Sequence, residues 1–229
     1  MSSPFLSFII TSAGKGLRFG KSKEPKQYHL INGIPIFIYS LISISKLKNK
    51  KEIFLTINKS QKPDLIKKKL KKYKLDEVRV ILGGETRAES VLNAFHEIKS
   101  NNGLIIIHDS VRPNFNFLNI KKIIKNLNQY SGTVVASKIY NTVKSVKNNS
   151  ILKTLDRSEL WVSETPQIFK YKALASCYKK DDGKFEYTDE AELLEKNRFK
   201  IKIYDNKEFN MKITTKEDLK IYKQLLRNV

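Results

Sequence analysis

Short, continuously apolar segments alternate along the chain with segments whose apolar residues fall at helical spacing. The apolar segments are rich in β-branched and aromatic residues, which favour strands, and they read FLSFII, EIFLTI, EVRVIL, GLIIIH and GTVVAS. The segments between them have the periodicity of helices and read IPIFIYSLISISKL, KPDLIKKKLKKY, TRAESVLNAFHEI and FLNIKKIIKNLNQY. Strands alternating with helices predict βαβ units around a mainly parallel sheet, and continuously apolar strands predict a sheet buried on both faces.

The alternation breaks at residues 140–156, which read YNTVKSVKNNSILKTLD. Two β-like stretches flank the turn sequence KNN there, and they predict a β-hairpin arm that projects from the sheet. The chain is then expected to return through WVSETPQIF, two helices, the strand FKIKIYD and a last helix from Lys216. A length of 229 residues fits one α/β domain, residues 1–229, that carries this arm.

The chain is strongly basic, with a formal net charge of +21. Such a charge is typical of nucleic-acid-binding proteins, but here the lysines are spread along the whole chain. The sequence has no RNP motif, no zinc-ligand spacing and no basic region followed by heptads. We therefore expect no nucleic-acid partner.

The apolar runs are far shorter than the roughly 18 residues that a membrane span needs. The sequence FLSFII also lacks the charged and long apolar regions of a signal peptide. The single cysteine, Cys177, excludes a disulfide framework within one chain and fits a reducing compartment. We expect no membrane partner and a cytoplasmic location, or an organelle matrix after processing.

The first unusual segment, SAGKGLRFGKSKEPKQY, directly follows the first predicted strand, where α/β proteins place their ligands. It lacks the dinucleotide fingerprint, because Phe19 occupies the place of the third glycine, and it is not a Walker A loop. Gly14 and Gly16 still allow backbone N–H groups to surround a phosphate, and Arg18 and Lys26 add positive charge. The alternative interpretation is a solvated loop.

Two further segments also follow predicted strands. In GGETRAES, two glycines permit close approach of a ligand, although Thr86 and Glu89 also form the capping-box pattern of an ordinary helix start. In HDSVRP, Asp109 is placed to hold a metal or a ribose hydroxyl, and Arg112 can pair with a phosphate. His108 has the simpler interpretation of packing at the strand end, because no second metal ligand accompanies it.

Arginine is rare in this lysine-rich chain, and it concentrates in the unusual segments. The four arginines in these segments are Arg18, Arg87, Arg112 and Arg157. The planar guanidinium group binds phosphate through two parallel hydrogen bonds, so this distribution indicates phosphate recognition.

The segments SAGKGLRFGKSKEPKQY, GGETRAESV, HDSVRP, TLDRSELWVSETPQ, TDEA and NMKIT occur in the order typical of one family. Over nearly its whole length the sequence resembles the 2-C-methyl-D-erythritol 4-phosphate cytidylyltransferases. The resemblance implies a Rossmann-like three-layer nucleotidyltransferase fold whose arm clasps a second subunit in a homodimer. It also implies transfer of CMP from CTP to methylerythritol phosphate with release of pyrophosphate, in the non-mevalonate pathway to isoprenoid precursors. The implied cofactor is Mg²⁺ or another divalent cation.

The resemblance also implies roles for residues that match the family's motifs. The catalytic residues would be Arg18 and Lys26. The nucleotide would be bound by Ser12, Ala13, Gly14, Gly16, Gly83, Gly84, Glu85, Ser90 and Asp109. The acceptor would be bound by Ser110, Arg112, Thr142, Arg157 and Lys212. A metal ion would be held by Asp109.

The sequence departs from the family pattern at several positions. Ser12 replaces an alanine, HDSVRP replaces HDAARP, Glu164 replaces a glutamine, Asn141 replaces an aspartate and Glu85 replaces an aspartate. These changes leave open a cytidylyltransferase that acts on ribitol 5-phosphate or another polyol phosphate. A non-catalytic protein that binds nucleotides or nucleic acid is a further alternative, but the presence of both Arg18 and Lys26 argues against it.

Overall fold

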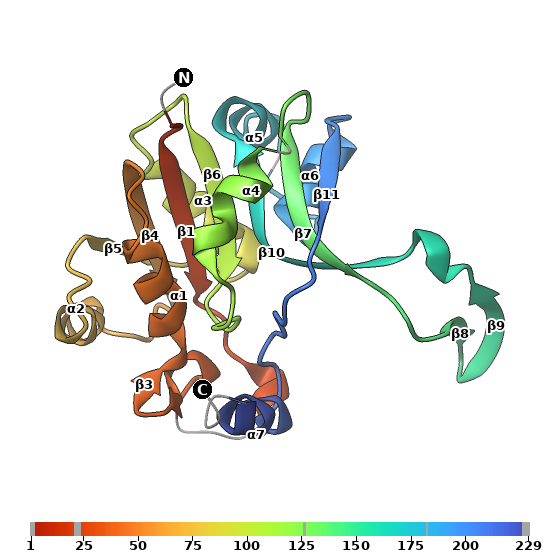
Figure 1. Ribbon diagram of the computed structural model, residues 1–229, viewed down its shortest axis with the longest axis horizontal. Coiled ribbons are helices and arrows are strands. Elements are labelled where there is room, and N and C mark those ends of the chain that lie inside the picture. The colour runs from red at the N-terminus through yellow and green to blue at the C-terminus, as the bar shows by residue number, and fades with distance from the viewer. Residues whose placement is uncertain (1–2, 21–23, 126, 182, 226–229) are drawn as a thin grey trace.

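The computed structural model describes residues 3–20, 24–125, 127–181 and 183–225. Within these residues, the central sheet has seven strands in the order β11-β7-β10-β6-β1-β4-β5 (Figure 1). Its strands are β1 (Leu6–Ser12), β4 (Lys51–Ile57), β5 (Val78–Leu82), β6 (Leu104–Asp109), β7 (Gly132–Lys138), β10 (Trp161–Lys170) and β11 (Ile201–Asp205). Only β10 among them runs antiparallel to its neighbours, β6 and β7, so the predicted mainly parallel sheet is confirmed.

The helices also follow the predicted alternation. They are α1 (Ile36–Ser45), α2 (Pro63–Lys72), α3 (Arg87–His96), α4 (Ile120–Ile124), α5 (Tyr171–Tyr178), α6 (Glu190–Lys196) and α7 (Lys216–Leu225). Short 3-10 turns occur at η1 (Leu17–Phe19), η2 (Lys26–Tyr28), η3 (Phe117–Asn119) and η4 (Arg157–Glu159), and β2 (Leu30–Ile31) pairs with β3 (Ile34–Pro35). The segment FLNIKKIIKNLNQY forms less helix than its spacing indicates, because η3 and the short α4 replace one long helix. Its several asparagines are poor helix formers, which agrees with this early end.

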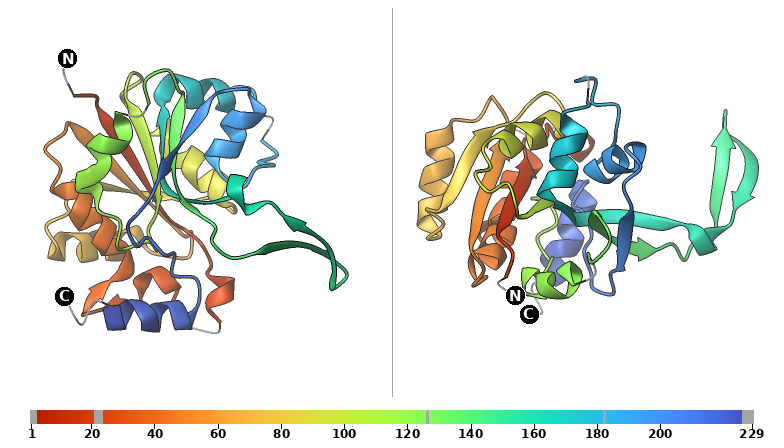
Figure 2. Two further views of the ribbon diagram at one scale, coloured as in Figure 1. Left: turned by 45° about the vertical axis from the view of Figure 1, so that its right-hand side comes forward. Right: turned by 90° about the horizontal axis from the view of Figure 1, so that it is seen from above.

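The sheet is buried on both faces, as its continuously apolar strands predict. Successive residues of a strand point to opposite faces, so Phe8 and Ile10 pack on one side with α1, α2 and α4. Ile9 packs on the other side with α3, α5 and α6. The predicted three-layer α/β arrangement is confirmed (Figure 2).

A smaller apolar cluster joins α7 to the loop that follows β1. Phe19 of η1 packs there with Ile213, Leu219 and Tyr222. The last helix of the chain therefore supports the loop that carries Arg18.

The arm is a two-stranded hairpin formed by β8 (Val143–Lys147) and β9 (Ser150–Leu155), and it extends away from the sheet in every view (Figures 1 and 2). Asn148 and Asn149 occupy its turn with φ angles of 48° and 60°, a left-handed pair that asparagine tolerates well. Val146 and Ile151 are 55% and 64% exposed. The arm therefore leaves apolar side chains without cover in one chain.

Among the described residues, no helix has both the length and the apolar character required to cross a membrane.

Candidate active site

A cavity of about 480 Å³ opens at the carboxyl ends of the parallel strands. It is lined by residues 11–16 at the end of β1 and just beyond it, residues 84–87 after β5, and residues 109–111 at the end of β6. The remaining lining residues are Arg18, Lys26, Gln27, Asn58, Ser90 and Lys212. The cavity thus lies where three of the unusual sequence segments meet, as the parallel topology predicts.

Most of the predicted site residues line this one cavity. They are Ser12, Ala13, Gly14, Gly16, Arg18, Lys26, Gly84, Glu85, Ser90, Asp109, Ser110 and Lys212. Gly83 lies beside the lining, and a Cβ atom there would come within 2.5 Å of the Ala13 side chain and 2.7 Å of Ser90 Oγ. Arg112 is buried next to Asp109.

Two side-chain amides fix the glycine loop after β1. Gln27 Nε2 donates to the Ser12 and Gly14 carbonyls at 2.6 and 3.2 Å, and Asn58 Nδ2 donates to the Ala13 carbonyl at 2.9 Å. These bonds hold the carbonyl groups of three successive residues at the start of the loop. Sequence reasoning missed both amides as site residues. The available signals were the position of Gln27 inside the PKQ motif and that of Asn58 directly after a predicted strand.

The GGETRAES segment both begins a helix and lines the cavity, so it agrees with the two interpretations of its sequence. Thr86 and Glu89 form a complete capping box at the start of α3. In the same turn, Gly84 N donates to Ser90 Oγ at 3.0 Å, and Ser90 Oγ donates to the Thr86 carbonyl at 2.8 Å. The helix cap therefore also fixes the backbone of Gly84 at the cavity wall.

The cavity concentrates positive charge. Arg18 lies exposed on η1, and Lys26 begins η2. Burial, followed by the charges of Lys212 and Arg18, lowers the pKa of Lys26 to about 8. Lys26 is therefore held close to two other cations against their repulsion, which is the arrangement expected where a polyanion binds.

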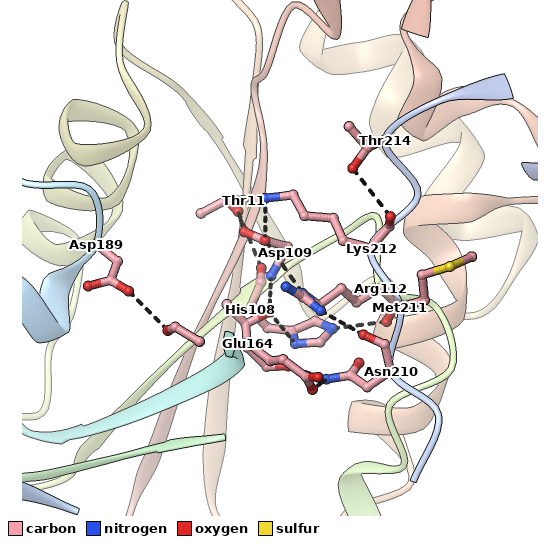
Figure 3. A network of polar contacts seen from close by, with 12 residues as sticks. Thr11, His108, Asp109, Arg112, Glu164, Asp189, Asn210, Met211, Lys212 and Thr214 are labelled. Carbon is pink, nitrogen blue, oxygen red and sulfur yellow. Dashed lines mark hydrogen bonds and ion pairs between the residues drawn. The ribbon is translucent and has the colours of Figure 1, made fainter. Parts of the chain in front are cut away.

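Asp109 is the negative centre of this group. Its Oδ2 lies 2.7 Å from Lys212 Nζ and 3.7 Å from Arg112 Nε, and its Oδ1 accepts from Thr11 Oγ1 at 3.1 Å (Figure 3). Arg87 Nε lies 3.6 Å from Oδ1. Burial alone would raise the pKa of Asp109, but the charges of Lys212, Arg87 and Arg112 outweigh it and hold that pKa well below its usual range. The carboxylate is therefore ionised at neutral pH.

The number of metal-ligating side chains in the site determines which kind of metal ion it could bind. No group of three or more His, Cys, Asp or Glu side chains gathers as a metal cage within the described part of the chain. Mg²⁺ commonly takes only one or two protein carboxylates and completes its coordination with water and substrate phosphates. The ionised Asp109 fits a cation of that kind, held mainly by a bound triphosphate.

A buried network stabilises the turn that joins Asp109 to Arg112. Asp109 N donates to Thr165 Oγ1 at 3.0 Å, and the Thr165 hydroxyl lies 3.1 Å from His108 Nδ1. His108 Nε2 lies 3.1 Å from the Arg112 carbonyl, which can only accept, so Nε2 carries the proton. Burial lowers the pKa of His108 to about 4, so the ring is neutral. The packing role predicted for His108 is confirmed.

Sequence reasoning missed the partner of Arg87. Arg87 Nη1 lies 2.7 Å from Glu190 Oε2, and the Glu190 side chain is fully buried at the start of α6. The pair connects the TDEA segment to the cavity wall across a long sequence separation. The clustering of arginines in the motifs marked Arg87, but the sequence has no local pattern that names Glu190.

The predicted acceptor residues Thr142 and Arg157 lie apart from the cavity of their own chain. Both are exposed at the base of the arm, where the Arg157 guanidinium donates to the Tyr140 carbonyl. Within one chain, the structure therefore does not bring them together with Lys26 or Lys212.

Comparisons with known proteins agree on one family. A family model described as 2-C-methyl-D-erythritol 4-phosphate cytidylyltransferase matches residues 6–228. The chain is 35% identical over 216 residues to the enzyme of that name from Dictyoglomus thermophilum, covering 92% of each chain. It is also 35% identical to that from Wigglesworthia glossinidia brevipalpis, covering 100% of this chain and 99% of the relative. The crystal structure of 4-diphosphocytidyl-2C-methyl-D-erythritol synthase from Anaerococcus prevotii superposes with a TM-score of 0.83 at 30% identity, covering 98% and 96% of the two chains.

Proposed function

Because the chain belongs to the 2-C-methyl-D-erythritol 4-phosphate cytidylyltransferase family, we propose that it transfers CMP from CTP to methylerythritol phosphate and releases pyrophosphate. The observation that carries this proposal is that the glycine loop, Arg18, Lys26, Lys212 and Asp109 meet in one cavity. The reaction would supply an intermediate of isoprenoid precursor synthesis.

The cytosine base binds against the backbone near Ala13 and Gly84, where the side chains are small or absent. Gly84 is fixed by Ser90, so its polar backbone atoms have a defined direction. A site that pairs with the edge of one base rejects other bases because its own polar groups are then left unpaired. The triphosphate then lies along the glycine loop toward Arg18 and Lys26.

The chemistry needs no side-chain nucleophile. A phosphate oxygen of the acceptor attacks the α-phosphorus of CTP, the new P–O bond forms, and pyrophosphate leaves with the electron pair of the broken bond. Negative charge accumulates on the α-phosphate oxygens in this step, and the cationic Arg18 and Lys26 stabilise it. Positioning of the two substrates and electrostatic stabilisation of the transition state therefore account for the acceleration of the reaction.

We further propose Mg²⁺, or another divalent cation, as the cofactor, bound by Asp109 together with the triphosphate. When bound, the cation would neutralise part of the phosphate charge. Lys212 Nζ lies 2.7 Å from the Asp109 carboxylate. From this position the Lys212 ammonium group would contact both Asp109 and the bound acceptor.

The exposed apolar side chains of the arm lead us to propose a homodimer. Val146 and Ile151 of the arm need a surface to cover them, and two-fold dimers are the commonest oligomers. Thr142 and Arg157 at the arm base would then complete the cavity of the partner subunit. The single, buried cysteine suits a reducing compartment, and on that ground we propose a cytosolic or organelle-matrix location.

The test is pyrophosphate release by the purified chain with CTP and methylerythritol phosphate, with the nucleotide product identified by mass spectrometry. The proposal expects release only when both substrates are present and a product that contains the methylerythritol group. Absence of that product, with the folded protein confirmed by circular dichroism, would contradict the proposal.

A further inference from the structure

The segment that carries Lys212 has no regular structure of its own. Residues 206–215 join β11 to α7 without forming helix or strand, and residues 206–214 of this connection are here called the strap. Backbone hydrogen bonds hold its two ends, from Asn206 N to the Ala136 carbonyl at 2.8 Å and from Ile213 N to the Val111 carbonyl at 2.9 Å. Between these ends, side chains determine where the strap lies.

The strap delivers two groups to the active site (Figure 3). The Asn210 carbonyl accepts from Arg112 Nη1 at 2.6 Å, and Lys212 Nζ reaches Asp109 at 2.7 Å. Both cations proposed to meet the acceptor therefore depend on the position of this segment.

One buried carboxylate anchors the middle of the strap. Glu164, on β10, accepts at Oε2 from Asn206 Nδ2 at 3.0 Å and from Asn210 Nδ2 at 2.8 Å. Glu164, Asn206 and Asn210 are all buried. Asn210 Nδ2 also donates to the Thr165 carbonyl at 2.9 Å, so the strap is held against the same β10 residue whose hydroxyl accepts from Asp109 N.

We propose that Glu164 is a positioning residue for the acceptor site: by accepting two amide hydrogen bonds, it fixes the strap so that Arg112 and Lys212 converge on Asp109. Removal of the Glu164 carboxylate leaves one N–H of each amide without an acceptor, while the Asn210 amide still donates to the Thr165 carbonyl and the Asn206 amide to the Glu208 carbonyl. An unsatisfied buried N–H is costly, so the loss favours displacement of the strap. The effect on turnover rests on the proposed function, because that function gives Arg112 and Lys212 their role. The anchoring itself rests only on the contacts above.

Three variants separate the possible causes. Glu164→Leu keeps a buried side chain of similar size but accepts no hydrogen bond. Glu164→Gln loses the charge and keeps a carbonyl oxygen that can accept from both asparagines. Glu208→Gln is the matched control, because Glu208 lies in the strap and its side chain accepts an exposed hydrogen bond from Asn119 Nδ2 at 2.9 Å.

Two measurements are made on each full-length variant: steady-state kinetics with CTP and methylerythritol phosphate, and hydrogen exchange of peptides from residues 206–214. Glu164→Leu is expected to raise the KM for the acceptor and lower kcat/KM by about 10- to 100-fold, the range found when a reacting group is misplaced. The strap should exchange faster in this variant. Glu164→Gln and Glu208→Gln should stay near the parent in both measurements.

Several outcomes would overturn the inference. Parent-like kinetics and exchange in Glu164→Leu would show that the strap needs no anchor. A Glu164→Gln variant as impaired as Glu164→Leu would assign the effect to charge, not to hydrogen bonding. Should Glu164→Leu not fold, Asn206→Ala, which removes one of the two donors, takes its place with a smaller effect of the same kind. If the parent itself transfers no CMP, the proposed function fails, and the exchange measurement still decides whether Glu164 anchors the strap.

Discussion

Arg18 lies exposed on η1 and lines the cavity beside Lys26. If its charge acts mainly on the transition state, Arg18→Ala should lower kcat by roughly 100-fold and change the KM for CTP much less, since loss of one stabilising donor commonly costs that much. Arg79→Lys is the control, because Arg79 pairs with Glu52 away from the cavity. An unchanged kcat in Arg18→Ala would remove this residue from the catalytic role.

If Lys26 acts as proposed, the reaction should depend on pH. Burial, Lys212 and Arg18 lower the pKa of Lys26 to about 8, and a lysine is cationic only below its pKa. The free enzyme should therefore lose kcat/KM for CTP as the pH rises through about 8, while Lys26→Arg should extend activity to higher pH because arginine stays protonated. The measurement is the pH profile of kcat/KM. A parent profile that stays flat through this range would contradict the assignment.

At the residue scale, local sequence pattern predicted residues that line the cavity. Arg18 and Lys26 follow the glycine-rich loop after β1, and Asp109 ends β6; the parallel topology brings such positions together. The supporting residues were not predictable in the same way. Glu164 and Glu190 reach their partners across long sequence separations, at Asn210 and Arg87, and local spacing contains no information on such pairs.

At the scale of elements, the turn between β5 and α3 packs tightly on the loop after β1. A Cβ atom on Gly83 would lie 2.5 Å from Ala13 Cβ and 2.7 Å from Ser90 Oγ, so one of these elements must shift. Gly83→Ala should lower the free energy of unfolding by about 1–3 kcal/mol, as overpacking commonly does, and weaken CTP binding. Chemical denaturation and calorimetry measure the two effects.

Gly14→Ala provides the comparison for that stability change. A Cβ atom on Gly14 meets nothing within 4 Å, so this variant should unfold like the parent. Equal stability of the Gly83→Ala variant and the parent would contradict the close packing of the two loops.

The order of strands and helices was predictable because each element has a clear period or a continuous apolar run. The strand pairing was less accessible: β10 inserts antiparallel between β6 and β7, and that placement depends on contacts distant in sequence. The strap was not predictable either. It has no repeating pattern, and its shape comes from individual bonds: side-chain bonds to Glu164 and a backbone bond from Ile213 N to the Val111 carbonyl.

At the scale of the whole molecule, we expect each active site to contain residues of both subunits, because the arm projects away from its own domain. If Arg157 completes the cavity of the partner subunit, a chain with Lys26→Ala and a chain with Arg157→Ala should each be inactive alone. Mixing the two chains should restore one intact site in each mixed dimer, formed by Lys26 of one chain and Arg157 of the other. Activity is assayed after mixing and subunit exchange. No recovery, together with a monomer in sedimentation at micromolar concentration, would contradict the shared site.

The central claim is that the acceptor is methylerythritol phosphate, and the most direct test compares acceptors with the same enzyme and CTP. Pyrophosphate release is measured with methylerythritol phosphate and with ribitol 5-phosphate, each over a range of concentrations. The account predicts a kcat/KM at least about tenfold higher for methylerythritol phosphate, since a site that pairs with the hydroxyl groups of one polyol leaves polar groups unpaired with another. Equal or better turnover of ribitol 5-phosphate would contradict it.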